Sequence, residues 1–153
     1  MTSTRHLFFD TSALVKYIHE EAGSEQVIDL IENDANSVCI SELAQVELVS
    51  ALHRKRREGA LSDLQLRQAL SGVDEMLASF RVEPLHPRVL EVAVERLREH
   101  GTNQALRTLD ALHLATFALV SAPNWQFVVA DNRLYDIVVE EGITALHPVR
   151  GTE

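Results

Sequence analysis

The sequence predicts a single α/β domain spanning residues 1–153, and three observations lead to this prediction. The chain has 153 residues, and a prior of about 150 residues per domain gives one domain. Short apolar segments alternate with longer helical ones, which is typical of layered α/β folds. The short segments are apolar almost throughout, as expected for strands of a parallel sheet that is covered on both faces.

Five short apolar runs are the predicted strands, and seven longer segments between them are the predicted helices. The strands are Leu7–Phe9, Val38–Ile40, Val82–Leu85, Phe127–Val129 and Ala145–Leu146. The helices are expected at 12–20, 24–33, 42–57, 62–79, 88–100, 109–121 and 133–140. No repeat, low-complexity segment or long linker divides the chain.

Capping residues mark several helix boundaries. Ser41 precedes Glu42 at the start of the third helix, where a hydroxyl cap and an acid are both favourable. The basic run Arg54–Arg57, followed by Gly59, suits the end of that helix. Ser62 opens the fourth helix, Pro87 precedes the fifth, and Gly101-Thr102-Asn103 follows it.

Composition narrows the class of protein. Cys39 is the only cysteine, so no internal disulfide can form, and its apolar neighbours suggest a buried small side chain. No apolar run is long enough for a signal-peptide core or a membrane span, and we expect a cytoplasmic protein with no membrane contact. The formal net charge of −9 argues against binding nucleic acid through the overall field. It is compatible with a nuclease whose bound cations invert the local potential, or with a basic protein partner.

Two aspartates follow predicted strands directly. Asp10 comes after Leu7–Phe9, and Asp131 comes just after Phe127–Val129; each precedes a helix. Open α/β sheets place their ligands at this edge. The alternative for both residues is a helix N-cap.

Two further acids belong to helices. Glu47 has Leu43, Ser50 and Ala51 as its helical neighbours, so its face should be largely covered, and a covered carboxylate needs an ion-pair partner or a metal. Asp110 lies in the first turn of an apolar helix, where the helix dipole alone would also stabilise it.

Because the carboxyl ends of parallel strands share one edge, these four acids can converge. Four carboxylates together would repel one another strongly without cations. Oxygen ligands favour Mg²⁺ or Mn²⁺ over Zn²⁺, and no Cys/His cluster with zinc spacing is present. Such a site suits phosphodiester hydrolysis, in which a bound ion activates water and stabilises the leaving oxygen.

Four stretches of the chain resemble the PIN-domain nucleases, most closely the VapC-type toxins of bacterial toxin–antitoxin pairs. The stretches are Phe9-Asp10-Thr11-Ser12-Ala13-Leu14-Val15-Lys16, Ser41-Glu42-Leu43-Ala44-Gln45-Val46-Glu47-Leu48, Leu106-Arg107-Thr108-Leu109-Asp110-Ala111-Leu112-His113-Leu114-Ala115 and Val129-Ala130-Asp131-Asn132-Arg133-Leu134. A lone Asp-Thr-Ser is weak evidence, whereas all four stretches in this order and spacing are strong evidence. The resemblance covers nearly the whole chain.

The resemblance implies a three-layer α/β/α fold with a central, mainly parallel sheet. It implies Mg²⁺- or Mn²⁺-dependent endoribonuclease activity, often on tRNA or ribosomal RNA, and inhibition by a cognate antitoxin protein. It also implies a homodimer. The acidic ligands of the family map onto Asp10, Glu47, Asp110 and Asp131.

The chain departs from the family pattern at one position. Similar proteins usually carry Ser or Thr two positions before the last aspartate, where this chain has Val129. A hydroxyl that could support Asp131 is therefore absent, while Ser12 and Thr108 remain as nearby hydroxyls.

Several other residues have two interpretations each. His113 can serve as a metal ligand or hydrogen-bond within its helix, and Arg54–Arg57 can hold RNA phosphates or form a solvated helix end. Trp125 can stack on a base or pack within the fold. The basic residues near the acids can contact a phosphate or neutralise a carboxylate; they are Lys16, Arg107 and Arg133.

Two rival functions remain open from the sequence. A phosphatase of the haloacid-dehalogenase type also places an aspartate after its first strand, but it needs a second one two positions later, where this chain has Ser12. A PIN-like module that binds without cutting is the other rival, and its only support in the sequence is Val129.

Overall fold

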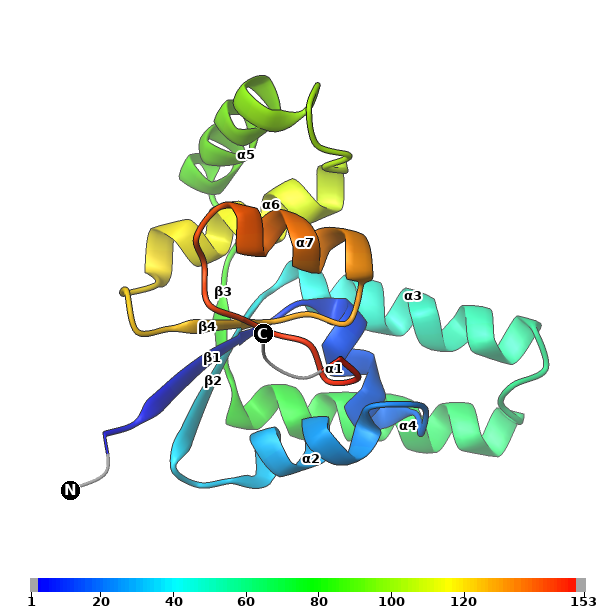
Figure 1. Ribbon diagram of the computed structural model, residues 1–153. Coiled ribbons are helices and arrows are strands. Elements are labelled where there is room, and N and C mark those ends of the chain that lie inside the picture. Colours follow the sequence, from blue (N-terminus) through cyan, green and yellow to red (C-terminus); the bar gives the residue numbers. More distant parts are fainter. Residues whose placement is uncertain (1–2, 151–153) are drawn as a thin grey trace.

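The computed structural model describes residues 3–150 and has a five-stranded sheet in which every neighbouring pair of strands is parallel (Figure 1). The strands are β1 (Arg5–Phe9), β2 (Asn36–Ser41), β3 (Arg81–Glu83), β4 (Gln126–Val128) and β5 (Ala145–Leu146). Their order in the sheet is β3-β2-β1-β4-β5. Each predicted strand is therefore confirmed.

Helices connect consecutive strands, as parallel pairing requires. They are α1 (Thr11–Ile18), α2 (Ser24–Glu32), α3 (Leu43–Arg57), α4 (Asp63–Ser79), α5 (Pro87–His100), α6 (Thr108–Val120) and α7 (Asn132–Glu140). All seven predicted helices are present, with boundaries that differ by at most two residues. At one of them, Ser41 ends β2 and its hydroxyl accepts a hydrogen bond from the backbone N–H of Leu43, so the third helix begins at Leu43.

The sheet separates two hydrophobic cores. Along β1, Leu7 and Phe9 face a core built with α1 to α4, whereas Phe8 faces a core built with α5 to α7. Figure 1 shows these two groups of helices on opposite faces of the sheet. The expected three-layer α/β/α fold is confirmed. Within residues 3–150, no helix is both long and apolar enough to cross a membrane.

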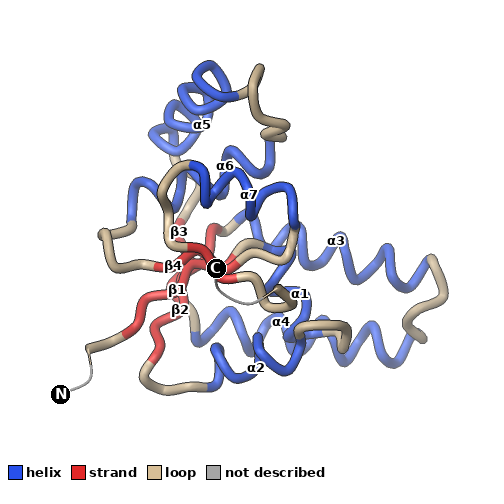
Figure 2. The backbone as a smooth tube through the Cα atoms, viewed as in Figure 1, coloured by secondary structure: helices blue, strands red, loops and turns tan. Residues whose placement is uncertain are grey.

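The strand order creates a switch point between β1 and β4, which are adjacent in the sheet but far apart in sequence (Figure 2). From β1 the chain first extends the sheet through β2 and β3, and it then returns to the other side of β1 for β4 and β5. Ligands of open α/β sheets bind outside the strand carboxyl ends at such a point. The backbone N–H of Asp10 donates to the carbonyl of Val128, which brings the end of β1 beside that of β4.

Two residues with open interpretations lie in or beside the core. Cys39 is buried, and this burial raises the pKa of its thiol to about 12. Trp125 is buried directly before β4, where it stacks on His6, so the packing interpretation holds and the base-stacking one does not.

Candidate functional site

The structure brings the four acids together around one pocket of about 520 Å³. Asp10, Glu47, Asp110 and Asp131 all line it, although they come from four separate segments of the chain. The pocket lies where β1 and β4 end and where α1, α6 and α7 begin, with α3 forming the opposite wall.

Asp10 is both a helix cap and a buried pocket residue. Its Oδ2 atom accepts hydrogen bonds from the backbone N–H and the hydroxyl of Ser12, so the helix-cap interpretation is correct for one oxygen. The other oxygen, Oδ1, lies 3.8 Å from Nε2 of His113. Burial raises the pKa of Asp10, and the nearby His113 and the hydrogen bonds from Ser12 offset only part of this effect.

The Ser12 hydroxyl joins the two strand ends. Besides donating to Asp10, it accepts hydrogen bonds from the backbone N–H groups of Ala130, at 3.0 Å, and Asp131, at 3.2 Å. One side chain thus fixes the loop after β1 against the loop after β4. Asp10 and Asp131 are held beside each other for this reason.

Glu47 reaches the pocket from α3 and is half-buried. Its Oε1 atom accepts hydrogen bonds from the Thr11 hydroxyl, at 2.8 Å, and from Nε2 of His113. Burial alone would raise the pKa of Glu47, but the His113 contact and the Thr11 hydrogen bond together lower it. The ion-pair alternative for Glu47 is therefore realised, with a histidine as the partner.

The sequence suggests a metal ligand or a hydrogen bond within the helix for His113, and in the structure its hydrogen bond goes to Glu47 of α3 and not to its own helix. It is almost completely buried on α6, one turn after Asp110, and it contacts both Glu47 and Asp10. Burial lowers the pKa of His113, yet the hydrogen bond to Glu47 and the negative charges of Asp10, Glu47 and Asp110 outweigh it and raise the pKa. Its spacing from Asp110 was the only signal, because residues three apart on a helix lie on neighbouring faces.

Two arginines accompany the remaining acids. Oδ2 of Asp110 lies 2.7 Å from Arg133 and 3.3 Å from Nε of Arg107. Arg107 also lies 3.3 Å from Oδ2 of Asp131, while Oδ1 of Asp131 accepts from the backbone N–H of Leu134 as a helix cap. Both arginines thus neutralise carboxylates, which was one of the two roles left open for them.

The donor set fits a hard divalent cation. Four carboxylates line the pocket, no cysteine or histidine is among its lining residues in the described part of the chain, and such oxygen donors suit Mg²⁺ or Mn²⁺. Within residues 3–150, no three His, Cys, Asp or Glu side chains are close enough together to hold a metal ion in their present rotamers. Asp110 and Asp131 form ion pairs with Arg107 and Arg133.

Three other candidate residues lie outside the pocket. Val129 is fully buried in the core with α5 to α7 and does not line the pocket, and Thr108 is exposed and does not line it either. Lys16 pairs with Glu21 at 3.1 Å, away from the four acids.

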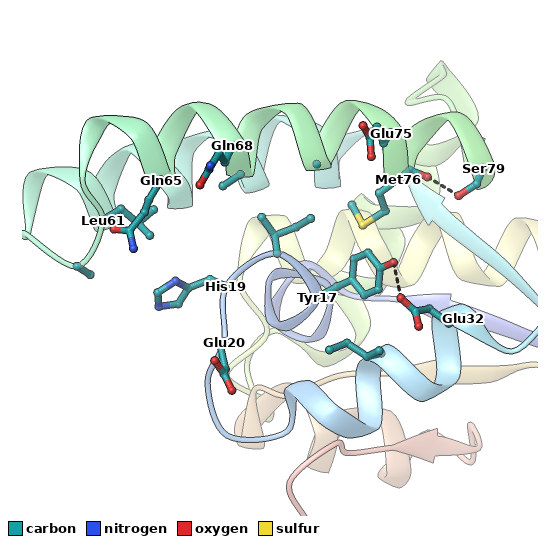
Figure 3. Close-up of a pocket in the computed structure, with 15 residues that line it drawn as sticks. Tyr17, His19, Glu20, Glu32, Leu61, Gln65, Gln68, Glu75, Met76 and Ser79 are labelled. Atoms are coloured by element: carbon teal, nitrogen blue, oxygen red, sulfur yellow. Dashed lines mark hydrogen bonds between the residues drawn. The ribbon is translucent and has the colours of Figure 1, made fainter.

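A larger hollow of about 930 Å³ lies elsewhere, between the end of α1, α2 and α4 (Figure 3). The Tyr17 hydroxyl donates to Glu32 across it, at 3.2 Å. None of the four acids lines this hollow, so the smaller pocket is the candidate site.

The fold and the pocket define an α/β domain with a carboxylate-lined site at the switch point of its parallel sheet, and comparison with known proteins identifies the family. The family model for the PIN domain matches residues 7–139. The chain is 31% identical over 129 residues to Ribonuclease VapC45 of Mycobacterium tuberculosis, covering 84% of this chain and 86% of that one. The chain therefore belongs to the PIN-domain family and, within it, to the VapC type.

Solved structures share the fold at lower identity. The structure of Mycobacterium tuberculosis VapC20, described as a sarcin-ricin loop cleaving toxin, superposes with a TM-score of 0.66 at 19% identity, covering 90% of this chain and 95% of that one. A toxin–antitoxin complex from Klebsiella pneumoniae gives a TM-score of 0.59 at 18% identity, covering 93% and 97%. These likenesses show the same fold.

Proposed function

We propose that this protein is a Mg²⁺- or Mn²⁺-dependent endoribonuclease that hydrolyses RNA phosphodiester bonds. The observation that carries the proposal is the convergence of Asp10, Glu47, Asp110 and Asp131 on one pocket of a PIN domain. Its relatives of the VapC type are named ribonucleases, which supports RNA as the substrate. The whole chain, residues 1–153, acts as one nuclease domain in this proposal.

The four carboxylates would hold the metal, and the neighbouring side chains keep them in place. When bound, the cation supplies an activated water and offsets the charge on the phosphate. Ser12 positions Asp10 and the loop that carries Asp131, while Thr11 and His113 fix Glu47. Arg107 and Arg133 reduce the repulsion among the carboxylates, which would otherwise oppose their close approach.

The biological setting we propose is that of the toxin in a VapBC-type pair. The target is tRNA or ribosomal RNA, the protein works in the cytoplasm, and it forms a homodimer. A separate cognate antitoxin protein would inhibit it, and the structural similarity to a toxin–antitoxin complex from Klebsiella pneumoniae supports this partner. The net charge of −9 suits a partner with basic residues.

The decisive experiment is cleavage of total cellular RNA by the purified protein in EDTA, Mg²⁺ or Mn²⁺. Asp110→Asn and Asp10→Asn, prepared identically, control for contaminating ribonucleases. We expect discrete fragments only from the wild type with metal. We also expect each variant to lose more than the roughly 10–100-fold that loss of an outer-shell partner costs.

Circular dichroism must show that both variants are folded. Full activity in either folded variant would refute the assignment of its residue as a ligand. Hydrolysis of a small phosphomonoester without RNA cleavage would favour the phosphatase, although Ser12, at the position of the second aspartate, is committed to hydrogen bonds. Metal binding without any cleavage would favour a binding module.

A further inference from the structure

Two arginines line the acidic pocket, and they come from different elements. Arg54 projects from α3, and Arg107 precedes α6. We propose that Arg54 and Arg107 bind phosphates of the RNA backbone on two sides of the four acids. This inference rests on the proposed ribonuclease function and adds the residues that hold the substrate.

Arg54 is the member of the basic run that faces the pocket. Glu47, Ser50, Ala51 and Arg54 all line it, and their spacing places them on one face of α3. Seven residues of helix put Arg54 about 10 Å along the axis from Glu47. It therefore reaches a part of the substrate beyond the acids themselves.

The other basic residues of the run are occupied or directed elsewhere. Lys55 pairs with Glu21 at 3.6 Å, and Arg56 pairs with Asp63 at 2.6 Å. Arg57 is exposed and does not line the pocket. In the described part of the chain, Arg54 is exposed and forms no ion pair, so its guanidinium is available to an anion from outside.

Arg107 is held loosely enough to exchange its partners. Its side chain is 67% exposed, and its contacts to Asp110 and Asp131 are both 3.3 Å. Ion pairs this exposed contribute about 0–1 kcal/mol each, so replacing a carboxylate with a phosphate costs little. Arg133 differs, because it is 30% exposed, lies 2.7 Å from Asp110 and donates to the carbonyl of Ala105.

The net negative charge of the protein favours basic side chains beside the site. The net charge of −9 and the acidic pocket both repel RNA at a distance. Arginines on the pocket walls supply local positive charge where the backbone must lie, and their planar donor groups match phosphate oxygens. Phosphate contacts of this kind position the substrate and do not read its sequence.

The test compares Arg54→Gln and Arg107→Gln with Arg57→Gln, which removes the same charge from the same end of α3 as Arg54. Binding of a fluorescein-labelled single-stranded RNA of mixed sequence is measured by anisotropy in Mg²⁺, in an Asp10→Asn background that prevents cleavage. We expect each pocket variant to weaken binding about tenfold, as loss of one charged hydrogen-bonded contact does. The salt dependence of binding should also flatten by about 0.7 per lost phosphate contact. Arg57→Gln should leave both measurements unchanged.

A second measurement separates a phosphate-binding role for Arg107 from a structural one. Mn²⁺ binding without RNA is measured calorimetrically on the otherwise wild-type chain. Because Arg107 competes with the cation for Asp110 and Asp131, Arg107→Gln should bind Mn²⁺ more tightly while it binds RNA more weakly. A residue that only maintained the fold would weaken both.

The inference is overturned if the wild type cleaves RNA but the pocket variants bind it as Arg57→Gln does. It is also overturned for Arg107 if Mn²⁺ and RNA binding weaken together. If the wild type neither cleaves nor binds RNA, the proposed function fails, and this inference fails with it. Failure of the phosphate-binding inference alone is thus distinguished from failure of the proposed ribonuclease function.

Discussion

Replacing Ser12 with alanine should loosen the candidate site and lower the stability of the whole domain. The hydroxyl makes one hydrogen bond to the Asp10 carboxylate and accepts two from the backbone N–H groups of Ala130 and Asp131. Hydrogen bonds to charged groups contribute about 1.5–3 kcal/mol, and neutral ones about 1 kcal/mol. Water in the pocket can replace some of these hydrogen bonds. We therefore expect Ser12→Ala to lower the free energy of unfolding by about 2 kcal/mol, which is less than the three hydrogen bonds would contribute together.

For a domain of this size, about 2 kcal/mol corresponds to a fall in Tm of about 4–8 °C. The matched control is Ser50→Ala, because Ser50 lines the same pocket from an exposed position on α3. Both substitutions replace serine with alanine inside a helix, so the gain in helix propensity largely cancels. Ser12→Thr keeps the hydroxyl and should recover most of the loss.

Thermal melts followed by circular dichroism give the Tm, and RNA cleavage gives the functional effect. We expect a loss of about 10–100-fold in cleavage, as for other residues that orient metal ligands. Equal Tm values for Ser12→Ala and Ser50→Ala would refute the reasoning that this hydroxyl holds the two strand ends together.

Four further predictions use different parts of the molecule. Mg²⁺ or Mn²⁺ at about 100 times its Kd should stabilise the wild type by about 2.7 kcal/mol and so raise its Tm. Asp110→Asn should show little of this rise. An unchanged Tm of the wild type would argue against a metal site shared by the four acids. Gly72→Ala within α4 should stabilise the protein by about 0.5–1 kcal/mol in urea unfolding, because the added Cβ would lie 3.8 Å from Ile18 and creates no clash; a destabilised variant would contradict this. Burial and, to a lesser extent, the charge of Arg150 lower the pKa of His147 from 6.5, so the unfolded chain binds the extra proton first, and stability should fall as the pH drops below 6.5. The urea-derived difference between wild type and His147→Asn should shrink in that range, and a constant difference would contradict the assignment. Native Cys39, with a pKa of about 12, should resist alkylation near neutral pH and react only in denaturant, whereas rapid labelling of the folded protein would show that the thiol is accessible.

Much of the fold could be predicted from the sequence because local pattern and topology agree. The apolar strands and the capped helices alternate along the chain, and only a parallel sheet with helices on both faces buries them all. The convergence of Asp10 and Asp131 follows from the same logic, since parallel strands end at one edge. Glu47 and Asp110 could be placed near that edge only because their helices begin there.

The pairing within the site could not be predicted in the same way. His113 meets Glu47 across 66 positions of sequence, and Arg107 meets Asp131 across 24. No periodicity encodes such contacts, because they depend on how α3, α6 and α7 pack against the sheet and on which rotamers result. The helix-cap interpretation of Asp10 and Asp131 is correct for one oxygen of each, while the other oxygen faces a charged neighbour and leaves the proposed metal-ligand role open.

The unusual Val129 illustrates how the fold resolves a departure from the family pattern. A hydroxyl two positions before Asp131 was expected to support the site, and its absence weakened the case for that aspartate. Val129 packs into the core beneath α5 to α7, so its side chain points away from the acids. The backbone N–H of Asp131 instead donates a hydrogen bond to the hydroxyl of Ser12, which lies at the neighbouring strand end. Support for Asp131 therefore comes from the first acidic motif of the chain, and the two motifs act as one structural unit.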